Sequence, residues 1–282
     1  MTQDKAAPAA TSEPSSRNLL MRVIAALVLA PVAIAIAYAG GVLWTLLVTL
    51  AAIGLYVEWL MVIGVGHTLR VTVAGALALA AAGLCLGTGR LDASLSVLAV
   101  GLIVVAVISS EQRRWTIAGF CYAAVAEVAS VVLRQDPEEG FVALMFVLLV
   151  VWATDIGGYF AGRSIGGPKL WPRVSPKKTW AGAVGSFVGS LVVAAGFAVF
   201  GLGAVVPVLV LGAVLSVVSQ FGDLFESAVK RRFGVKDSSH LIPGHGGLMD
   251  RLDGFVAAVA VAAIFGFLRG GADGVGHGLM VW

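Results

Sequence analysis

Charged residues are scarce in this sequence. Only 12% of its 282 residues are Asp, Glu, Lys or Arg, whereas 59% are hydrophobic. A soluble domain usually carries about 25% charged residues. The shortage of charge therefore excludes an ordinary water-soluble domain and indicates a membrane protein.

Cysteine is also scarce. The chain has two cysteines, Cys85 and Cys121, and both lie in apolar stretches without a partner at the spacing of a metal site. We expect both to be small core residues rather than ligands.

The hydrophobic residues gather in nine stretches of a length that suits transmembrane helices, since the hydrocarbon core takes roughly 20 mostly apolar residues. They cover residues 19–38, 42–63, 71–86, 91–108, 117–133, 141–161, 181–200, 206–229 and 254–268. We therefore predict an all-α, polytopic integral membrane protein with about nine transmembrane helices. Residues 1–16 are small and polar, so we expect a disordered N-terminal tail.

Basic residues orient these helices, because short cytoplasmic loops are enriched in Lys and Arg. With a cytoplasmic N-terminus, all of the 19 Lys and Arg residues except Arg90, Arg134 and Arg269 fall on the cytoplasmic side. Such a face suits anionic lipid heads or nucleotide phosphates rather than nucleic acid. The first stretch ends in Ala37-Tyr38-Ala39, like a signal-peptide cleavage site, but it is longer than a signal-peptide core.

Five acids fall within or at the ends of predicted spans: Glu58, Glu127, Asp155, Asp223 and Glu226. A charge in the bilayer centre costs about 2.5–3.5 kcal/mol even on lenient scales, so each needs a reason. Near the basic face, Asp155 and Asp223 predict a polar cavity, with an interhelical hydrogen bond or snorkelling as the alternative. For Glu58 and Glu127 a polar cavity and a purely structural contact are equal alternatives, because no other catalytic or binding residue types lie next to them in the sequence.

Carboxylates recur at helical spacing. Asp223 and Glu226 stand at i and i+3, and so do Asp250 and Asp253, so each pair shares one helix face. If the last helix begins near residue 248, Asp223, Asp250 and Asp253 converge from two helices. Such oxygen ligands suit Mg²⁺, and a second cation is compatible with them. The alternative is that Asp250 only caps its helix and Asp253 pairs with Arg251.

Two basic segments accompany these acids. Lys230, Arg231 and Arg232 alone match an ordinary stop-transfer cluster. The glycine-rich turn at Gly246-Gly247 changes this interpretation, because exposed backbone N–H groups can bind phosphate while cations neutralise it. The second segment, residues 162–182, contains prolines and glycines that forbid a long helix, so we expect a loop that closes over the first segment.

These residues resemble the signature of the integral membrane phosphatidate cytidylyltransferases, also called CDP-diacylglycerol synthases. The signature falls on Ser227, Lys230-Arg231, Lys236-Asp237, His245-Gly246-Gly247 and Asp250-Arg251-Leu252-Asp253, and an upstream block falls on residues 155–163 and 175–180. The resemblance covers about the last half of the chain. Two positions depart from it: Ala181 stands where many members have Glu, and Ser239 where Gly is frequent.

The resemblance implies that CTP and phosphatidic acid give CDP-diacylglycerol and pyrophosphate at the inner (plasma) membrane. The catalytic residues would be Asp223, Lys230, Arg231, Lys236, Asp250 and Asp253, with Asp223, Asp250 and Asp253 holding Mg²⁺. The substrate-binding residues would be Asp155, Arg163, Ser175, Lys177, Lys178, Ser227, Asp237, His245, Gly246, Gly247 and Arg251. Residues 17–135 would form an N-terminal transmembrane region and residues 136–282 the catalytic transmembrane region.

Two other functions stay open at this point. A CTP-dependent lipid kinase acting on a polyprenol would transfer the γ-phosphate instead of CMP. A cation-coupled transporter would also need buried acids, although no inverted repeat of the kind many transporters contain is evident. The sequence does not decide between a monomer and a homodimer.

Overall fold

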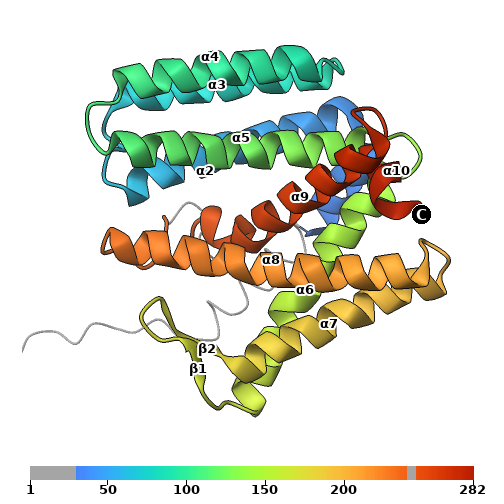
Figure 1. The fold of residues 1–282 in the computed structure, drawn as a ribbon. Helices are drawn as coiled ribbons and strands as arrows, with labels where there is room; N and C mark the ends of the chain where they lie inside the picture. Colours follow the sequence, from blue (N-terminus) through green and yellow to red (C-terminus); the bar gives the residue numbers. More distant parts are fainter. Residues whose placement is uncertain (1–29, 240–245) are drawn as a thin grey trace, which may run out of the picture.

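The fold is helical with one small hairpin (Figure 1). A computed structural model describes residues 30–239 and 246–282. The long helices are α2 (Gly41–Val62), α3 (Leu69–Gly87), α4 (Leu91–Ile108), α5 (Arg113–Gln135), α6 (Gly140–Ser164), α7 (Trp180–Val199), α8 (Val205–Arg232) and α9 (Met249–Gly270). A short helix, α10 (Val275–Met280), follows α9, and strands β1 (Lys169–Trp171) and β2 (Ser175–Thr179) form the hairpin between α6 and α7.

Among the described residues, eight helices are long and apolar enough to cross a membrane. This confirms the predicted all-α polytopic fold, and the eight correspond to the second to ninth predicted stretches. The first predicted stretch, residues 19–38, lies mostly outside the described residues, and its described part belongs to the helix Ala30–Ala39. The span predicted for residues 19–38 therefore stays a prediction.

The helices pack in layers that bring distant parts of the chain together. α3 and α4 pair on the outside of α2 and α5, while α9 packs between α5 and α8 (Figure 1). α6 and α7 pack closely together and contact α8, and the hairpin lies at one end of this group. The two ends of the signature, on α8 and α9, thus lie on neighbouring helices.

An aromatic core stabilises the bundle at the end where α2 finishes and α5 begins. Trp59 is 1% exposed, stacks near Tyr122 and Phe225, and donates a 2.8 Å hydrogen bond from Nε1 to the Trp115 carbonyl. Buried aromatic residues of this size dominate packing energy. The core holds α2, α5 and α8 together beside the start of α9.

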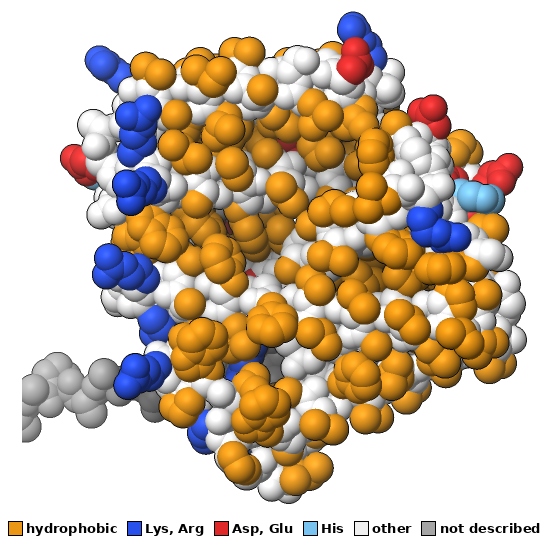
Figure 2. Space-filling view, in the orientation of Figure 1, with side chains coloured by type: hydrophobic (Ala, Val, Ile, Leu, Met, Phe, Trp, Pro, Cys, Tyr) orange, Lys and Arg blue, Asp and Glu red, His pale blue; other side chains and the backbone are white. Residues whose placement is uncertain are grey.

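The surface is apolar along the helices and basic at one end. Figure 2 shows Lys and Arg side chains along the end of the bundle that carries the hairpin, and fewer at the opposite end. Cys121 is exposed on this surface, so the prediction that it is a core residue was wrong. A membrane protein is apolar on both its lipid-facing and its core-facing sides, and hydropathy does not separate them.

The predicted boundary between two transmembrane regions falls at the turn between α5 and α6. α2 and α5 also pack on α9, so the two halves share an extensive contact. The division at residue 135 stays a prediction.

Candidate active site

A polar cavity of about 520 Å³ lies between α6, α7, α8 and the hairpin. The predicted site residues that line it are Asp155, Arg163, Lys177, Lys178 and Asp223. Other polar lining residues are Thr154, Thr179, Ser186 and Gln220. Two acids and three cations from separate stretches of sequence therefore line one cavity. A polar cavity at Asp155 and Asp223 was predicted from the sequence.

Glycines allow α6 and α7 to approach closely beside this cavity. A Cβ atom on Gly158 would collide with Ser186 Oγ, and one on Gly185 would lie 2.7 Å from the Gly157 carbonyl oxygen. Small residues at a membrane helix interface allow such contact between backbones. Ser186 fills the junction and donates a 2.7 Å hydrogen bond to the Thr154 carbonyl.

The hairpin brings the second basic segment onto α8. β1 and β2 pair antiparallel, with Lys169 opposite Thr179. Lys178 forms an ion pair with Asp223 on α8, and Thr179 Oγ1 caps α7 by accepting a 3.1 Å hydrogen bond from the Gly182 amide. The segment is thus a short hairpin ending at a helix cap, and its Lys178 faces the Asp223 carboxylate of α8.

A second polar cluster surrounds Lys230 at the end of α8. Lys230 is 8% exposed and forms ion pairs with Asp250 and with Glu226, whose Oε2 lies 2.7 Å from Nζ. Asp250 Oδ2 also accepts hydrogen bonds of 3.0 Å from the backbone amides of Ser238 and Gly247. Lys230 is therefore buried against carboxylates, and its predicted contact with phosphate stays a prediction.

Asp253 links the cluster to the cavity. Its charge interacts with those of Asp223 and Glu226 on α8 and of Asp155 on α6, so Asp253 lies within electrostatic range of the carboxylates of both neighbouring helices. The Tyr122 hydroxyl of α5 lies near Asp253 and Glu226 and is buried without a hydrogen-bond partner among the described residues. Within residues 30–239 and 246–282, no group of three or more His, Cys, Asp or Glu side chains is arranged so that it could hold a metal ion without a rearrangement.

The other predicted site residues lie around these two clusters. Ser227 Oγ donates a 3.5 Å hydrogen bond to Asp223 Oδ1, and exposed Arg163 donates one of 2.7 Å to the Tyr159 hydroxyl. Arg231 is exposed in the last turn of α8, Lys236 and Asp237 are exposed after it, and Ser175 begins β2. Gly246 has a φ of +85°, a conformation that favours glycine, and His245 lies outside the described residues.

Arg251 lies between the carboxylates and an apolar groove. Its charge interacts with that of Asp155, and its side chain also lines a groove of about 410 Å³ formed mainly by α2, α9 and the helix Ala30–Ala39. The groove is otherwise lined mostly by apolar residues such as Leu47, Trp152 and Phe255. A cation and an apolar groove thus adjoin each other.

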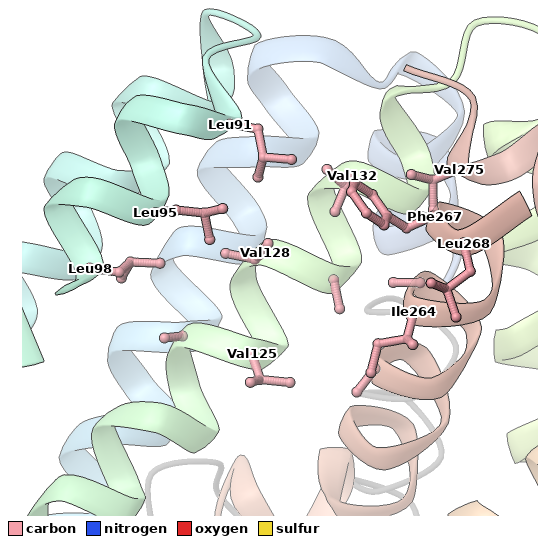
Figure 3. Close-up of a pocket in the computed structure, with 14 residues that line it drawn as sticks. Leu91, Leu95, Leu98, Val125, Val128, Val132, Ile264, Phe267, Leu268 and Val275 are labelled. Carbon is pink, nitrogen blue, oxygen red and sulfur yellow. The ribbon is translucent and has the colours of Figure 1, made fainter. Parts of the chain in front are cut away.

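Another pocket is lined only by apolar residues. It holds about 380 Å³ between α4, α5 and α9, and every residue that lines it is apolar, including Leu91, Val128 and Phe267 (Figure 3). No polar side chain lines this pocket, so it offers no side-chain contact for a phosphate.

Residues 20–268 match the model of the cytidylyltransferase family. The chain belongs to this family. It is 42% identical over 256 residues to a phosphatidate cytidylyltransferase of Brucella suis, across 88% of this chain and 93% of that protein. It is 44% identical over 139 residues to a phosphatidate cytidylyltransferase of Haemophilus influenzae, across 47% of this chain and 48% of that protein. It is 41% identical over 143 residues to one of Bacillus subtilis, across 49% of this chain and 50% of that protein.

Sequence reasoning gave no site role to three polar residues of this cytidylyltransferase family member. Glu226, Glu58 and Ser238 all contact the Lys230–Asp250 cluster directly or through one partner. Glu226 could have been chosen from its place on the face that Asp223 occupies. Glu58 could not, because its partners follow about 180 positions later in the chain.

Gly247 gives a first test of this packing. A Cβ atom there would collide with Ser238 Oγ and lie 2.6 Å from Glu58 Oε2, so we expect Gly247→Ala to destabilise the protein by about 1–3 kcal/mol through overpacking. Thermal unfolding of the purified protein measures this. Gly196→Ala is the matched control, since no atom other than its own local helix backbone lies within 4 Å of its added Cβ. Equal stability of the two variants would contradict the described packing.

Proposed function

We propose that the protein transfers CMP from CTP to phosphatidic acid, giving CDP-diacylglycerol and pyrophosphate for phospholipid biosynthesis. The observation that carries the proposal is the cavity in which Asp155 and Asp223 meet Arg163, Lys177 and Lys178. It lies in a chain that aligns over most of its length with proteins named phosphatidate cytidylyltransferase. Cations beside carboxylates suit a site that brings two polyanions together.

The reaction needs little covalent help from the protein. The ionised phosphate of phosphatidic acid attacks the α-phosphorus of CTP, forming a new P–O bond while the bond to the oxygen bridging the α- and β-phosphates breaks. Pyrophosphate leaves with the bonding electrons, so no water or redox partner is required. Positioning and charge stabilisation then supply most of the acceleration, as in other phosphoryl transfers.

The chain's cations bind and orient the phosphates. Arg163, Lys177 and Lys178 line the cavity and bind the lipid phosphate or the leaving pyrophosphate, while Arg231 and Lys236, exposed at the end of α8, reach the phosphates of CTP. Charge-assisted hydrogen bonds of this type are stronger than neutral ones. Ser227, which already donates to Asp223, is a hydrogen-bonding group and not a nucleophile.

Asp223, Asp250 and Asp253 are the proposed holders of Mg²⁺. The donor chemistry fits, because carboxylate oxygens are the hard ligands that Mg²⁺ prefers. The mutual approach of Asp253, Asp223 and Glu226 also concentrates negative charge that a divalent cation would compensate. Asp250 is paired with Lys230 in the structure, so Lys230 competes for that carboxylate. When bound, Mg²⁺ supplies charge neutralisation on the triphosphate.

The lipid substrate fits the boundary between the groove and the carboxylates. An acyl chain of phosphatidic acid lies in the apolar groove, and Arg251 at its polar end faces the phosphate. CTP is cytoplasmic and the diacylglycerol stays in the bilayer, so the site belongs at the cytoplasmic headgroup boundary of the inner (plasma) membrane. A homodimer is compatible with this arrangement and would be detected by the mass of the purified protein in detergent.

The proposal is tested with purified protein, CTP, Mg²⁺ and vesicles of stated lipid. Vesicles containing phosphatidic acid should give pyrophosphate and CDP-diacylglycerol in equal amounts, while vesicles of phosphatidylcholine alone should give neither. Release of CDP with a polyprenol acceptor, and no pyrophosphate with phosphatidic acid, would replace the proposal by a lipid kinase.

A further inference from the structure

Glu58 is a buried carboxylate with an unusual set of partners. It lies one turn before the end of α2 and is 0% exposed. Its Oε1 accepts hydrogen bonds from the Leu248 amide at 2.7 Å and from Ser239 Oγ at 2.6 Å. Its Oε2 accepts from the Met249 amide at 2.7 Å and from Ser238 Oγ at 2.9 Å. Four donors therefore compensate a charge that would otherwise be costly in this apolar setting.

All four donors belong to the stretch that leads into α9. Leu248 is the N-cap residue of α9 and Met249 its first residue, so their amides are among those left without a partner inside the helix. Leucine has no side-chain acceptor to cap them. Glu58 supplies the missing acceptor from a helix 190 positions earlier in the chain, and its charge also suits the positive end of the helix dipole.

Asp250 lies in the first turn of α9, directly after the residues that Glu58 contacts. The Ser238 hydroxyl lies 2.9 Å from Glu58 Oε2 and 3.0 Å from Asp250 Oδ2, so one donor is shared between the two carboxylates. The amides of Ser238 and Gly247 also donate to Asp250. A shift of the start of α9 would thus move Asp250 directly and Asp253 one turn later.

We propose that Glu58 is a positioning residue for the carboxylates of α9. It anchors Ser238, Ser239, Leu248 and Met249 to α2, and so fixes where Asp250 and Asp253 stand relative to Asp223. This inference rests on the proposed function, since its effect is read through CMP transfer. Outer residues that orient metal-holding carboxylates typically affect metal affinity or activity by 10- to 100-fold.

Glu58→Gln tests the proposal, because it keeps the shape but turns one acceptor into a donor. That donor faces either the Leu248 amide and the Ser239 hydroxyl or the Met249 amide and the Ser238 hydroxyl. We expect the activity per folded enzyme to fall, or the Mg²⁺ concentration for half-maximal activity to rise, by roughly 10- to 100-fold. Hydrogen–deuterium exchange of a peptide spanning residues 247–253 should become faster. Glu58→Asp, which keeps both oxygens, should recover part of each loss.

Glu127→Gln is the matched control. Glu127 is also a 0% exposed carboxylate in a membrane helix, but its hydrogen bond comes from Thr49 Oγ1 at 2.7 Å on α2. We expect its replacement to leave Mg²⁺ dependence and exchange of residues 247–253 unchanged. If Glu58→Gln does not fold, Ser238→Ala, which removes the shared hydroxyl, should show the same changes at smaller size.

Each outcome decides the proposal. Slower CMP transfer together with faster exchange supports it. Folded Glu58→Gln protein with wild-type kinetics, or with altered kinetics but wild-type exchange, overturns it. A wild-type protein that lacks CMP transfer would refute the proposed function instead, and the exchange measurement alone would then decide whether Glu58 anchors the start of α9.

Discussion

Replacing Asp223 by asparagine is expected to lower CMP transfer by roughly 10²- to 10³-fold, the loss typical when one preorganised charge is removed from a site of this kind. Asp223 lines the polar cavity, pairs with Lys178 and accepts a hydrogen bond from Ser227. Asparagine keeps the shape but removes the charge that faces both Lys178 and the proposed cation. The rate of CDP-diacylglycerol formation at saturating CTP measures the effect.

The control for this variant is Asp273→Asn. Asp273 is an exposed carboxylate in the turn between α9 and α10, away from the basic end of the bundle, and its replacement should leave the rate unchanged. Equal rates for the two variants would show that Asp223 has no special part in the reaction.

Replacing Lys230 by methionine is expected to have the largest effect on folding. The change removes the cation that pairs with both Glu226 and Asp250. Glu226 is 1% exposed, and within the described residues its oxygens have no donor other than Lys230, so its charge would be left buried and uncompensated. Breaking a buried pair from one side costs about 3–5 kcal/mol, and thermal unfolding in detergent should show a large drop in midpoint.

Two further variants separate this effect from a general loss of surface charge. Arg231→Met removes a neighbouring exposed cation, whose hydrogen bond goes to the Val235 carbonyl at 3.1 Å, and should change stability by less than about 0.5 kcal/mol. Adding Glu226→Gln to Lys230→Met should restore part of the lost stability. A Lys230→Met protein as stable as wild type would contradict the buried ion pairs.

Much of the fold followed from sequence because membrane spans have a strong signal. Length and hydropathy placed the eight described spans. The last predicted stretch began at residue 254, but α9 begins at Met249, which meets the condition under which Asp250 and Asp253 share the first turns of the last helix. The side of a helix that faces lipid was not predictable, as Cys121 shows. Apolar residues suit both surroundings, so periodicity is weak.

The candidate site was predicted in part, and the reason lies in sequence separation. Asp155, Lys178 and Asp223 stood out as charges in or beside apolar stretches, and the structure brings them together in one cavity. The charge run at Lys230 gave no sign that this lysine is buried, because a stop-transfer cluster has the same composition. The hydrogen bonds of Glu58 depend on how α2 packs against α9, which no local pattern encodes.

The central claim is that this site transfers CMP, and the position of label in the lipid tests it most directly. Purified protein would receive phosphatidic acid, Mg²⁺ and CTP labelled at either the α- or the γ-phosphate. We predict label in the lipid product only from the α-phosphate, with the γ-label recovered in pyrophosphate. Label reaching lipid from the γ-phosphate alone would contradict the account.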